Sequence, residues 1–377
     1  MYNCRVSYFY KNYEHKNGVK MFGSDHYIPV LKWKQGEYQA LHRLSENIKK
    51  KINPLIEIPP IGYDFESGKE RESIDSHLGD FGRRLKAKWQ NRTCFVDLKY
   101  IAAHTRMGTG KHYIEEVFDQ CRSEKCNPIP VVSLKSDSDF LDSVKEVIKK
   151  DRRGVCFRIY LEDFDRPNLR NDLEILLITL GVGISESDIV IDYENRKLEP
   201  VGVFVKTFLD LFQVIRALNR WRTFTVIGTS YPNSIAAIRP PFGTIPRSEW
   251  SFYKKLRLGI GEGRLPTFGD YAVAHPELVD LDHRLIKPFA KLRYTIDDEW
   301  HIGRGDTVRT HGFEQYRGLC SQLMRQPYFD GPSFSEGDQY IDECSKGNVP
   351  TGNLSTWVWV SINRHLTKVV SDLATLP

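Results

Sequence analysis

The chain has 377 residues, of which 40% are hydrophobic, and its 54 basic and 49 acidic side chains give a net charge of +5. This excess is small and the charges are mixed along the chain, so the composition does not indicate a dedicated nucleic-acid-binding protein. No apolar run reaches membrane-spanning length, and the seven cysteines are scattered without a CxxC pair. We therefore expect a globular, cytoplasmic protein with reduced thiols and no membrane partner.

Residues 1–26 are polar and aromatic, and they lack the apolar core of a signal peptide. They predict a loosely ordered N-terminal extension, and the position of Met21 just before the first strand favours an upstream extension of the reading frame. Residues 27–377 contain no internal repeat, low-complexity tract or clear linker, so they predict a single domain.

After residue 26, short apolar segments alternate with segments of helical spacing such as residues 38–51 and 201–218. The predicted strands are residues 27–31, 54–58, 93–99, 129–135, 154–161, 189–194, 224–230 and 267–272. No hairpin turns separate these strands, so we expect them to be parallel and joined by right-handed crossovers. Eight such units predict a (β/α)8 TIM-like barrel. A doubly wound open sheet is the competing fold, but no GxGxxG follows the first strand.

The alternation ends after residue 272. Residues 289–295 and 300–304 predict a hairpin, and residues 313–324 and 355–373 predict helices. We expect this region to supply the last helix of the barrel and a C-terminal hairpin-and-helix appendage from about residue 285. The sequence Asn363-Arg364-His365 is interpreted as packed against the barrel rather than placed in its mouth.

Each predicted strand has polar or charged residues at its downstream end, where a buried strand is otherwise apolar. In a (β/α)8 barrel these ends converge on one mouth, which is where barrel enzymes have their active sites. The residues are Lys32 and Lys34, Glu57, Asp97 and Lys99, Ser133 and Lys135, Arg158 and Tyr160, Asp192 and Glu194, Ser230, and Asp270. The alternative reading is a salt-bridged lid that closes the barrel without binding a ligand.

Four cations beside four acids at one opening suit an anionic small molecule that the cations hold. The predicted ligand-binding residues are Lys32, Lys34, Lys99, Lys135, Arg158, Glu194, Ser230 and Asp270. The predicted catalytic residues are Glu57, Asp97 and Asp192, because a carboxylate can act as a general base or bind Mg2+. A lysine among other cations, with a lowered pKa, could instead form a Schiff base.

The opening motif is Tyr27-x-Pro29-x-Leu31-Lys32-x-Lys34-x-Gly36-Glu37-x-x-Ala40-Leu41, followed by Pro54-Leu55-Ile56-Glu57. Looser motifs are Phe268-Gly269-Asp270-Tyr271, Arg293-Tyr294-Thr295, and Gly352-Asn353 through Trp357 to His365. Together they resemble the protein beta family of bacteria and their phages, over nearly the whole chain from Met21. The resemblance implies a phage or mobile-element setting and a role in anti-phage defence. It implies no particular reaction, so it transfers no site residue.

Three functions remain open from the sequence. The leading hypothesis is a barrel in a phage–host conflict that binds a phosphorylated or nucleotide-like ligand at its mouth and hydrolyses it. The second is a non-catalytic sensor or adaptor for a protein partner of a defence system, with exposed tryptophans at positions 33, 250, 357 and 359. The third is a nucleic-acid-binding protein that uses runs such as Lys49–Lys51, although a charge run is usually a solvated helix face.

Overall fold

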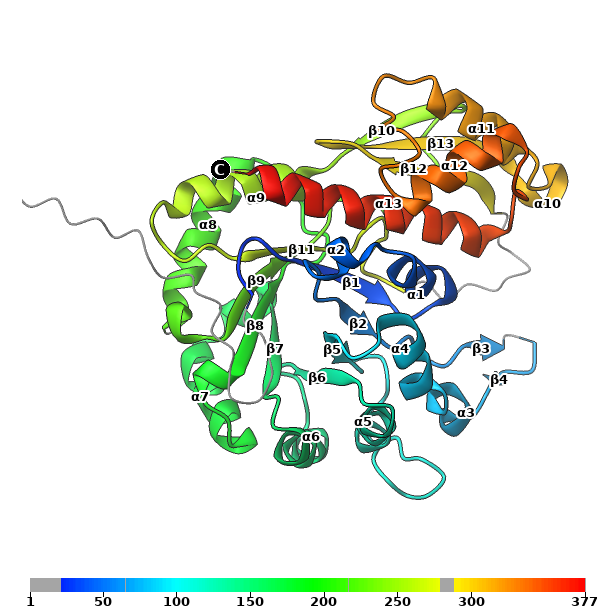
Figure 1. Ribbon diagram of the computed structural model, residues 1–377. Coiled ribbons are helices and arrows are strands. Elements are labelled where there is room, and N and C mark those ends of the chain that lie inside the picture. Colours follow the sequence, from blue (N-terminus) through cyan, green and yellow to red (C-terminus); the bar gives the residue numbers. More distant parts are fainter. Residues whose placement is uncertain (1–21, 65, 216, 279–287, 377) are drawn as a thin grey trace, which may run out of the picture.

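The computed structural model describes residues 22–64, 66–215, 217–278 and 288–376 (Figure 1). Its centre is a closed barrel of eight parallel strands in the order β1-β11-β9-β8-β7-β6-β5-β2. The barrel strands are β1 (Tyr27–Lys32), β2 (Leu55–Glu57), β5 (Thr93–Asp97), β6 (Asn127–Val132), β7 (Val155–Tyr160), β8 (Ser187–Asp192), β9 (Thr223–Ile227) and β11 (Thr267–Asp270). The predicted (β/α)8 barrel is confirmed, and every barrel strand overlaps a predicted one.

Helices surround the barrel on its outside (Figure 1). They are α1 (Gln35–His42), α2 (Glu46–Lys49), α3 (Ile74–Leu78), α4 (Phe81–Trp89), α5 (Tyr113–Ser123), α6 (Ser138–Asp151), α7 (Leu169–Leu180), α8 (Val201–Val214) and α9 (Ser248–Ile260). The single helix predicted over residues 38–51 is divided in two, because Ser45 adopts an extended conformation and its side chain caps α2 by accepting from the Ile48 amide. A small hairpin, β3 (Tyr63–Asp64) and β4 (Lys69–Glu70), lies outside the barrel.

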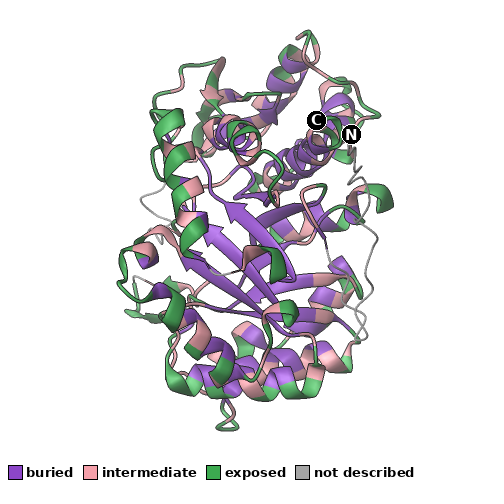
Figure 2. Ribbon diagram, turned by 90° about the vertical axis from the view of Figure 1, so that its left-hand side faces the viewer, coloured by how far each residue is buried: buried purple, intermediate pink, exposed green. Residues whose placement is uncertain are grey.

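The barrel strands are buried on both faces, whereas the surrounding helices alternate between buried and exposed residues (Figure 2). One set of alternating side chains fills the barrel interior, including Ile28, Val30, Leu55 and Phe95. The opposite set packs under the helices. Because side chains alternate along a strand, this division fixes which residue of each strand reaches the mouth.

Phe22 and His26 were assigned by sequence to the loosely ordered extension, but both are buried in the structure. The Phe22 ring lies 6.2 Å from the ring of Phe95 and 5.6 Å from that of His26. Phe22 therefore belongs to the interior cluster of the barrel. The rest of the predicted extension, residues 1–21, lies outside the described residues.

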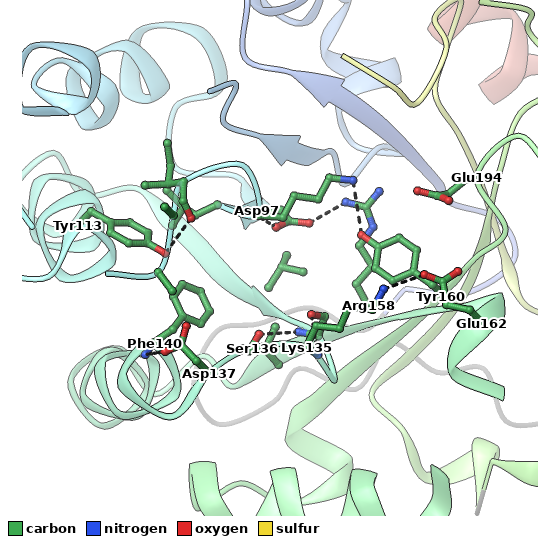
Figure 3. Close-up of a pocket in the computed structure, with 18 residues that line it drawn as sticks. Asp97, Tyr113, Lys135, Ser136, Asp137, Phe140, Arg158, Tyr160, Glu162 and Glu194 are labelled. Carbon is green, nitrogen blue, oxygen red and sulfur yellow. Dashed lines mark hydrogen bonds and ion pairs between the residues drawn. The ribbon is translucent and has the colours of Figure 1, made fainter. Parts of the chain in front are cut away.

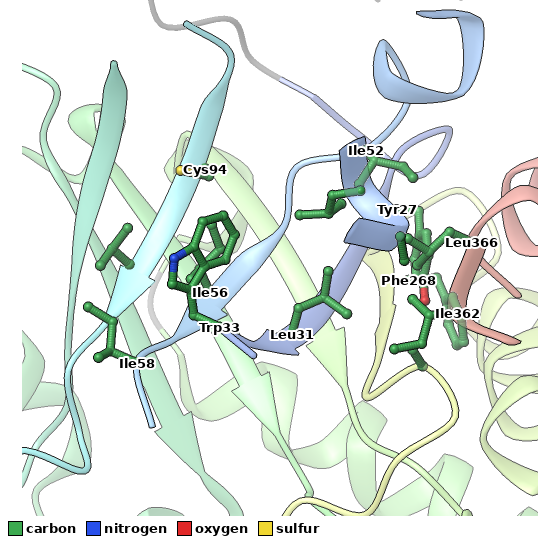
Figure 4. Packing of buried hydrophobic residues seen from close by; sticks show 14 of the residues in the cluster. Tyr27, Leu31, Trp33, Ile52, Ile56, Ile58, Cys94, Phe268, Ile362 and Leu366 are labelled. Atoms are coloured by element: carbon green, nitrogen blue, oxygen red, sulfur yellow. The ribbon is translucent and has the colours of Figure 1, made fainter. Parts of the chain in front are cut away.

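Helix α13 (Leu354–Thr375) covers the side of the barrel formed by β1 and β11. Its residues Ile362 and Leu366 pack beside Tyr27 and Phe268 (Figure 4). This helix takes the place of the last barrel helix, as the sequence predicted. None of the described helices, including this long one, is apolar enough over a sufficient length to cross a membrane.

The appendage consists of a three-stranded antiparallel sheet and helices packed beside it (Figure 1). Its elements are β10 (Phe242–Pro246), β12 (Phe289–Thr295), β13 (Glu299–Thr307), α10 (Val308–His311), α11 (Gln315–Met324) and α12 (Glu336–Lys346). The predicted hairpin is the pair β12–β13. The sequence did not predict α12, nor that β10 leaves the segment after β9 to pair with β13.

Candidate active site

Arg158, on the inward face of β7, is the centre of a buried network at the carboxyl end of the barrel. Its Nη1 donates to Glu57 Oε1 and to Asp97 Oδ2, each at 2.7 Å. Its Nε and Nη2 donate to Asp192 Oδ2 at 2.9 and 2.6 Å, and Nη2 also donates to the Tyr271 hydroxyl at 2.7 Å. One guanidinium that is 1% exposed therefore holds together carboxylates from β2, β5 and β8.

Lys99 brings a second cation to this network. Its Nζ lies 2.9 Å from Glu57 Oε1 and donates to the Tyr160 hydroxyl at 3.5 Å. With all groups ionised, two cations face three carboxylates, so the cluster has an excess of negative charge. Such an excess in a buried place favours proton uptake by one of the carboxyl groups.

The carboxylates respond differently to this environment. Burial opposes ionisation of Glu57, but Arg158 and Lys99 outweigh it and hold the pKa of Glu57 below its ordinary value. At Asp97, burial dominates over the same two cations and raises the pKa of the carboxyl group. Burial and the neighbouring charge of Asp192 also raise the pKa of Glu194. Asp97 and Glu194 are thus the mouth carboxylates whose pKa values move towards neutral pH, as proton-transfer groups require.

A cavity of about 450 Å³ opens beside the network, and we call it the mouth cavity (Figure 3). Asp97, Arg158 and Tyr160 lie at one end of it, and Tyr113 and Phe140 lie at the other (Figure 3). This volume lies within the range of small-molecule sites, and the mixture of aromatic walls with a few charged groups is typical of them.

The rim of the mouth cavity carries further charges. Lys135 Nζ lies 2.9 Å from Glu162 Oε1, and both side chains are exposed. Glu194 also lines the cavity, and its backbone adopts a φ of 52°, in the left-handed region. This conformation costs a residue with a side chain about 1 kcal/mol or more, and such residues concentrate at functional sites. The amide of Glu194 donates to Asp192 Oδ1 at 2.8 Å, which ties its position to the network.

Residues 271–278, which follow β11, form a strap across the barrel mouth. Lys32 Nζ donates to the carbonyls of His275 and Glu277 at 2.7 and 3.0 Å. In the segments that follow β5 and β8, the Tyr100 hydroxyl donates to the Pro276 carbonyl at 3.3 Å, and Asn195 contacts His275 Nε2 at 2.6 Å. The strap is therefore fastened to three sides of the mouth.

The structure brings together five of the predicted residues, namely Glu57, Asp97, Lys99, Arg158 and Asp192, and places Lys135 and Glu194 on the wall of the same cavity. Of the three predicted catalytic residues, only Asp97 lines the cavity, whereas Glu57 and Asp192 are fully buried behind Arg158. Lys32 and Lys34 belong to neither the network nor this cavity. Lys32 holds the strap, and Lys34, which precedes α1, is exposed.

Two predicted mouth residues are placed elsewhere, and both predictions were wrong for the same reason. Ser230 Oγ donates to the Pro246 carbonyl at 2.9 Å and accepts from the Ser248 amide, outside the barrel. Asp270 Oδ2 faces His365 Nε2 at 2.9 Å, under α13. On β9 and β11 these residues share the parity of the outward set, represented by Phe268, so they point away from the mouth.

Sequence reasoning missed Tyr271, whose hydroxyl donates to Asp192 Oδ2 at 2.6 Å. The sequence did contain a signal for it. Tyr271 lies two residues after Gly269, which faces the barrel interior on β11, so the two positions share the inward face. His365, on α13, is also clarified: its Nδ1 lies 2.9 Å from Thr295 Oγ1 and its Nε2 faces Asp270 of β11, so it is packed against the outside of the barrel as predicted.

The mouth residues do not fit a magnesium site. The cation that the three carboxylates share is the guanidinium of Arg158. Within the described ranges, no group of three His, Cys, Asp or Glu side chains is arranged to hold a metal ion. The carboxylates therefore pair with the cationic side chains of this chain, and their remaining chemical role is proton transfer.

The closed barrel and the charged network at its carboxyl end define a (β/α)8-barrel protein with a candidate site in the position that barrel enzymes use. Residues 27–371 match the Beta protein family, and the chain belongs to that family. The relative called Protein beta, from Enterobacteria phage P4, is 22% identical over 353 residues, which span 91% of this chain and 92% of the phage protein. The family resemblance seen in the sequence motifs is confirmed.

Solved barrel structures show a weaker likeness. A tryptophan synthase α-subunit from Pyrococcus furiosus has 10% identity and a TM-score of 0.38, over 67% of this chain and 89% of that one. Triosephosphate isomerase from Bartonella henselae has 9% identity and a TM-score of 0.35, over 65% of this chain and 92% of that one. The assignment of the barrel rests on this chain's own closed strand order.

Proposed function

We propose that this protein binds a phosphorylated or nucleotide-like small molecule in the mouth cavity and hydrolyses it, acting in the cytoplasm during a conflict between phage and host. The observation that carries the proposal is the position of Asp97. Its carboxylate lines the cavity, its Oδ2 accepts from Arg158 at 2.7 Å, and its Oδ1 accepts from the Lys99 amide at 2.9 Å. It is thus fixed in direction and still faces the space that a ligand would fill.

In this proposal Asp97 is the general base. It accepts a proton from a water molecule as the water oxygen attacks phosphorus and the bond from phosphorus to the leaving oxygen breaks. Glu57 and Asp192 are positioning residues, because they hold Arg158 and do not reach the cavity. Lys99 and Lys135 are the lysines that line the cavity, so they would meet the phosphoryl oxygens.

The phage–host part of the proposal is supported by the family alone, since the relative named above is a phage protein. The non-catalytic adaptor remains the second candidate. The four tryptophans that the sequence placed on its binding surface are all buried, between 1% and 7% exposed, so they supply no docking patch. The nucleic-acid hypothesis relied on the run Lys49–Lys51. In the structure, Lys49 is buried and pairs with Glu46 at 3.3 Å, and Lys51 pairs with Asp25 at 2.7 Å, so two of the three lysines already have an acidic partner.

Asp97→Asn should abolish the chemical step while leaving binding nearly intact. We expect hydrolysis of at least one member of a panel of ribonucleoside mono-, di- and triphosphates, and a loss in kcat of about 100-fold or more in the variant, the usual contribution of a general base. Released phosphate measures kcat, and calorimetry measures affinity, which should change less than about threefold. Because the pKa of Asp97 is raised, the acid limb of the wild-type kcat profile should lie above pH 3.8.

Asp188→Asn is the matched control, since Asp188 is 1% exposed and pairs with Arg222 at the opposite end of β8. This variant should lose stability but keep the wild-type kcat of its folded fraction. Wild-type turnover in the Asp97 variant would exclude the general base, and the absence of binding by every compound in the panel would exclude the ligand class. Expression of wild type and Asp97→Asn in phage-challenged bacteria, scored by plaque counts, tests the biological setting.

A further inference from the structure

A second cavity, of about 410 Å³, lies between the barrel and the appendage. We call it the seam cavity. Its walls come from the end of β1, the residues after β9, the strap, and the strands β12 and β13. It shares no lining residue with the mouth cavity, so it is a separate space.

Basic side chains from both walls line the seam cavity. They are Lys32, Lys34, Lys291, Arg293 and Arg304. The lining contains two acids. Burial raises the pKa of Glu37 to about 8 against the opposing charges of Lys32 and Lys34, so this group holds a proton at neutral pH. Glu277 is exposed and lies 3.8 Å from His275 Nδ1. Among the described residues, the lining therefore has an excess of positive charge.

The appendage wall concentrates three of these cations on one sheet face. Lys291 and Arg304 are directly opposite each other in the β12–β13 pair, and Arg293 lies two residues from Lys291 on the same strand. Like charges in such positions repel each other. The repulsion from Arg293, together with burial, lowers the pKa of Lys291 to about 8. No hydrogen bond or ion pair joins Lys291 Nζ to another described residue.

Local contacts hold the two arginines in place. Arg293 Nε donates to the Tyr231 hydroxyl at 3.0 Å. Arg304 Nη1 donates to the Ala236 carbonyl at 2.8 Å, and its guanidinium lies 4.4 Å from the centre of the Phe289 ring. These contacts fix both guanidinium planes without neutralising their charges. Within the part of the chain that the structure describes, these cations are fixed and have no ion-pair partner, which is the arrangement of a preorganised anion site.

We infer that the seam cavity is a second ligand site, which binds a small polyanion carrying two or more phosphate groups. Five cations on facing walls suit several phosphates rather than one carboxylate, because guanidinium and ammonium groups pair strongly with phosphate oxygens. The volume is that of a small-molecule pocket. The site does not depend on hydrolysis in the mouth cavity.

The test is calorimetric titration of the full chain with inorganic tripolyphosphate at low and at physiological salt. Wild type should bind one equivalent, more weakly as salt rises. Lys291→Met should weaken binding by about tenfold, because it removes one charge-assisted contact. The same variant should raise the melting temperature of the unliganded protein, because it relieves the repulsion with Arg293 and Arg304. A residue that served only the fold would not produce these two opposite shifts.

Lys34→Met tests the facing wall, and since Lys34 is exposed this variant preserves the fold if Lys291→Met does not. It should also weaken tripolyphosphate binding, whereas the exposed Lys50→Met should not. If a nucleoside triphosphate competes with tripolyphosphate, the ligand is an organic polyphosphate. If it does not compete, the ligand is an inorganic polyphosphate. Asp97→Asn should bind tripolyphosphate as wild type does, whatever its turnover. Absence of binding by wild type, or wild-type affinity in both Lys291→Met and Lys34→Met, would overturn the inference.

Discussion

Arg158→Met is expected to lower the free energy of unfolding by about 5 kcal/mol at pH 7. Removing one partner of a buried ion pair costs roughly 3–5 kcal/mol, because the other charge is left uncompensated. Here one guanidinium compensates Glu57, Asp97 and Asp192, and two of these have no exposed surface. Urea unfolding followed by tryptophan fluorescence and circular dichroism measures the loss, with the m-value as a check on two-state behaviour.

The same variant should show a distinct pH dependence. Without Arg158, the pKa values of Glu57 and Asp97 should rise well above their values in the unfolded chain, because Arg158 is the largest charge that opposes the effect of burial on both groups. A carboxyl group with a raised folded pKa contributes stability below its unfolded pKa and loses that contribution as the pH rises. The deficit of Arg158→Met relative to wild type should therefore be smaller at pH 5 than at pH 8. Adding Glu57→Gln and Asp192→Asn should restore part of the stability at pH 8.

Arg222→Met provides the comparison at the opposite end of the barrel. Arg222 is 4% exposed and pairs with one carboxylate, that of Asp188, which also accepts from the Thr223 hydroxyl at 2.7 Å. With one carboxylate released and one donor retained, we expect a loss of about 3 kcal/mol. If Arg158→Met costs no more than Arg222→Met, the network around Arg158 is not the main electrostatic element of the mouth.

The barrel and most of its charged mouth could be predicted because the inward parity was visible on several strands. Val30 precedes Lys32, Leu55 precedes Glu57, and Phe95 precedes Asp97 by two residues, so an apolar interior position is followed by a charged one. Parallel strands in sequence order then bring these ends to one opening. The alternation is a local property, and local sequence is sufficient to reveal it.

The same reasoning failed on β9 and β11. Along these two strands neither the inward-facing nor the outward-facing set of side chains carries a charge until the strand ends, so charge does not distinguish the two faces. The inward position of β11 is Gly269, followed by Tyr271, and the outward one is Phe268, followed by Asp270. Choosing the most polar residue selected Asp270, which serves the contact with α13. A consistent count of two from the glycine would have selected Tyr271.

The seam cavity could not be predicted because its walls meet only through the packing of the appendage on the barrel. Lys34 and Arg304 are far apart in the chain, and they line the same space because β12 and β13 lie beside the end of β1. Long-range packing of this kind has no periodic signal in a sequence. It also separates Lys32 and Lys34 from the other predicted ligand-binding lysines, which line the mouth cavity.

Glu37→Gln is expected to remove a large, pH-dependent destabilisation at the edge of the seam cavity. Glu37 is 8% exposed, and burial raises its pKa from an ordinary 4.5 to about 8. The folded state thus binds a proton that the unfolded state releases between these two values, so stability falls as the pH rises through that window. The full effect corresponds to about 5 kcal/mol above pH 8, at roughly 1.4 kcal/mol for each pH unit.

Unfolding free energies at pH 5 and pH 9 measure this effect directly. Glutamine keeps the shape and cannot ionise, so Glu37→Gln should be close to wild type at pH 5 and more stable than wild type at pH 9. Glu262→Gln, at an exposed position, should follow wild type at both pH values. A gain that is equal at pH 5 and pH 9 would show that packing, rather than the buried proton, sets the contribution of Glu37. A pH-dependent gain would instead establish that Glu37 is uncharged at neutral pH, so that it does not neutralise Lys32 and Lys34 at this edge of the cavity.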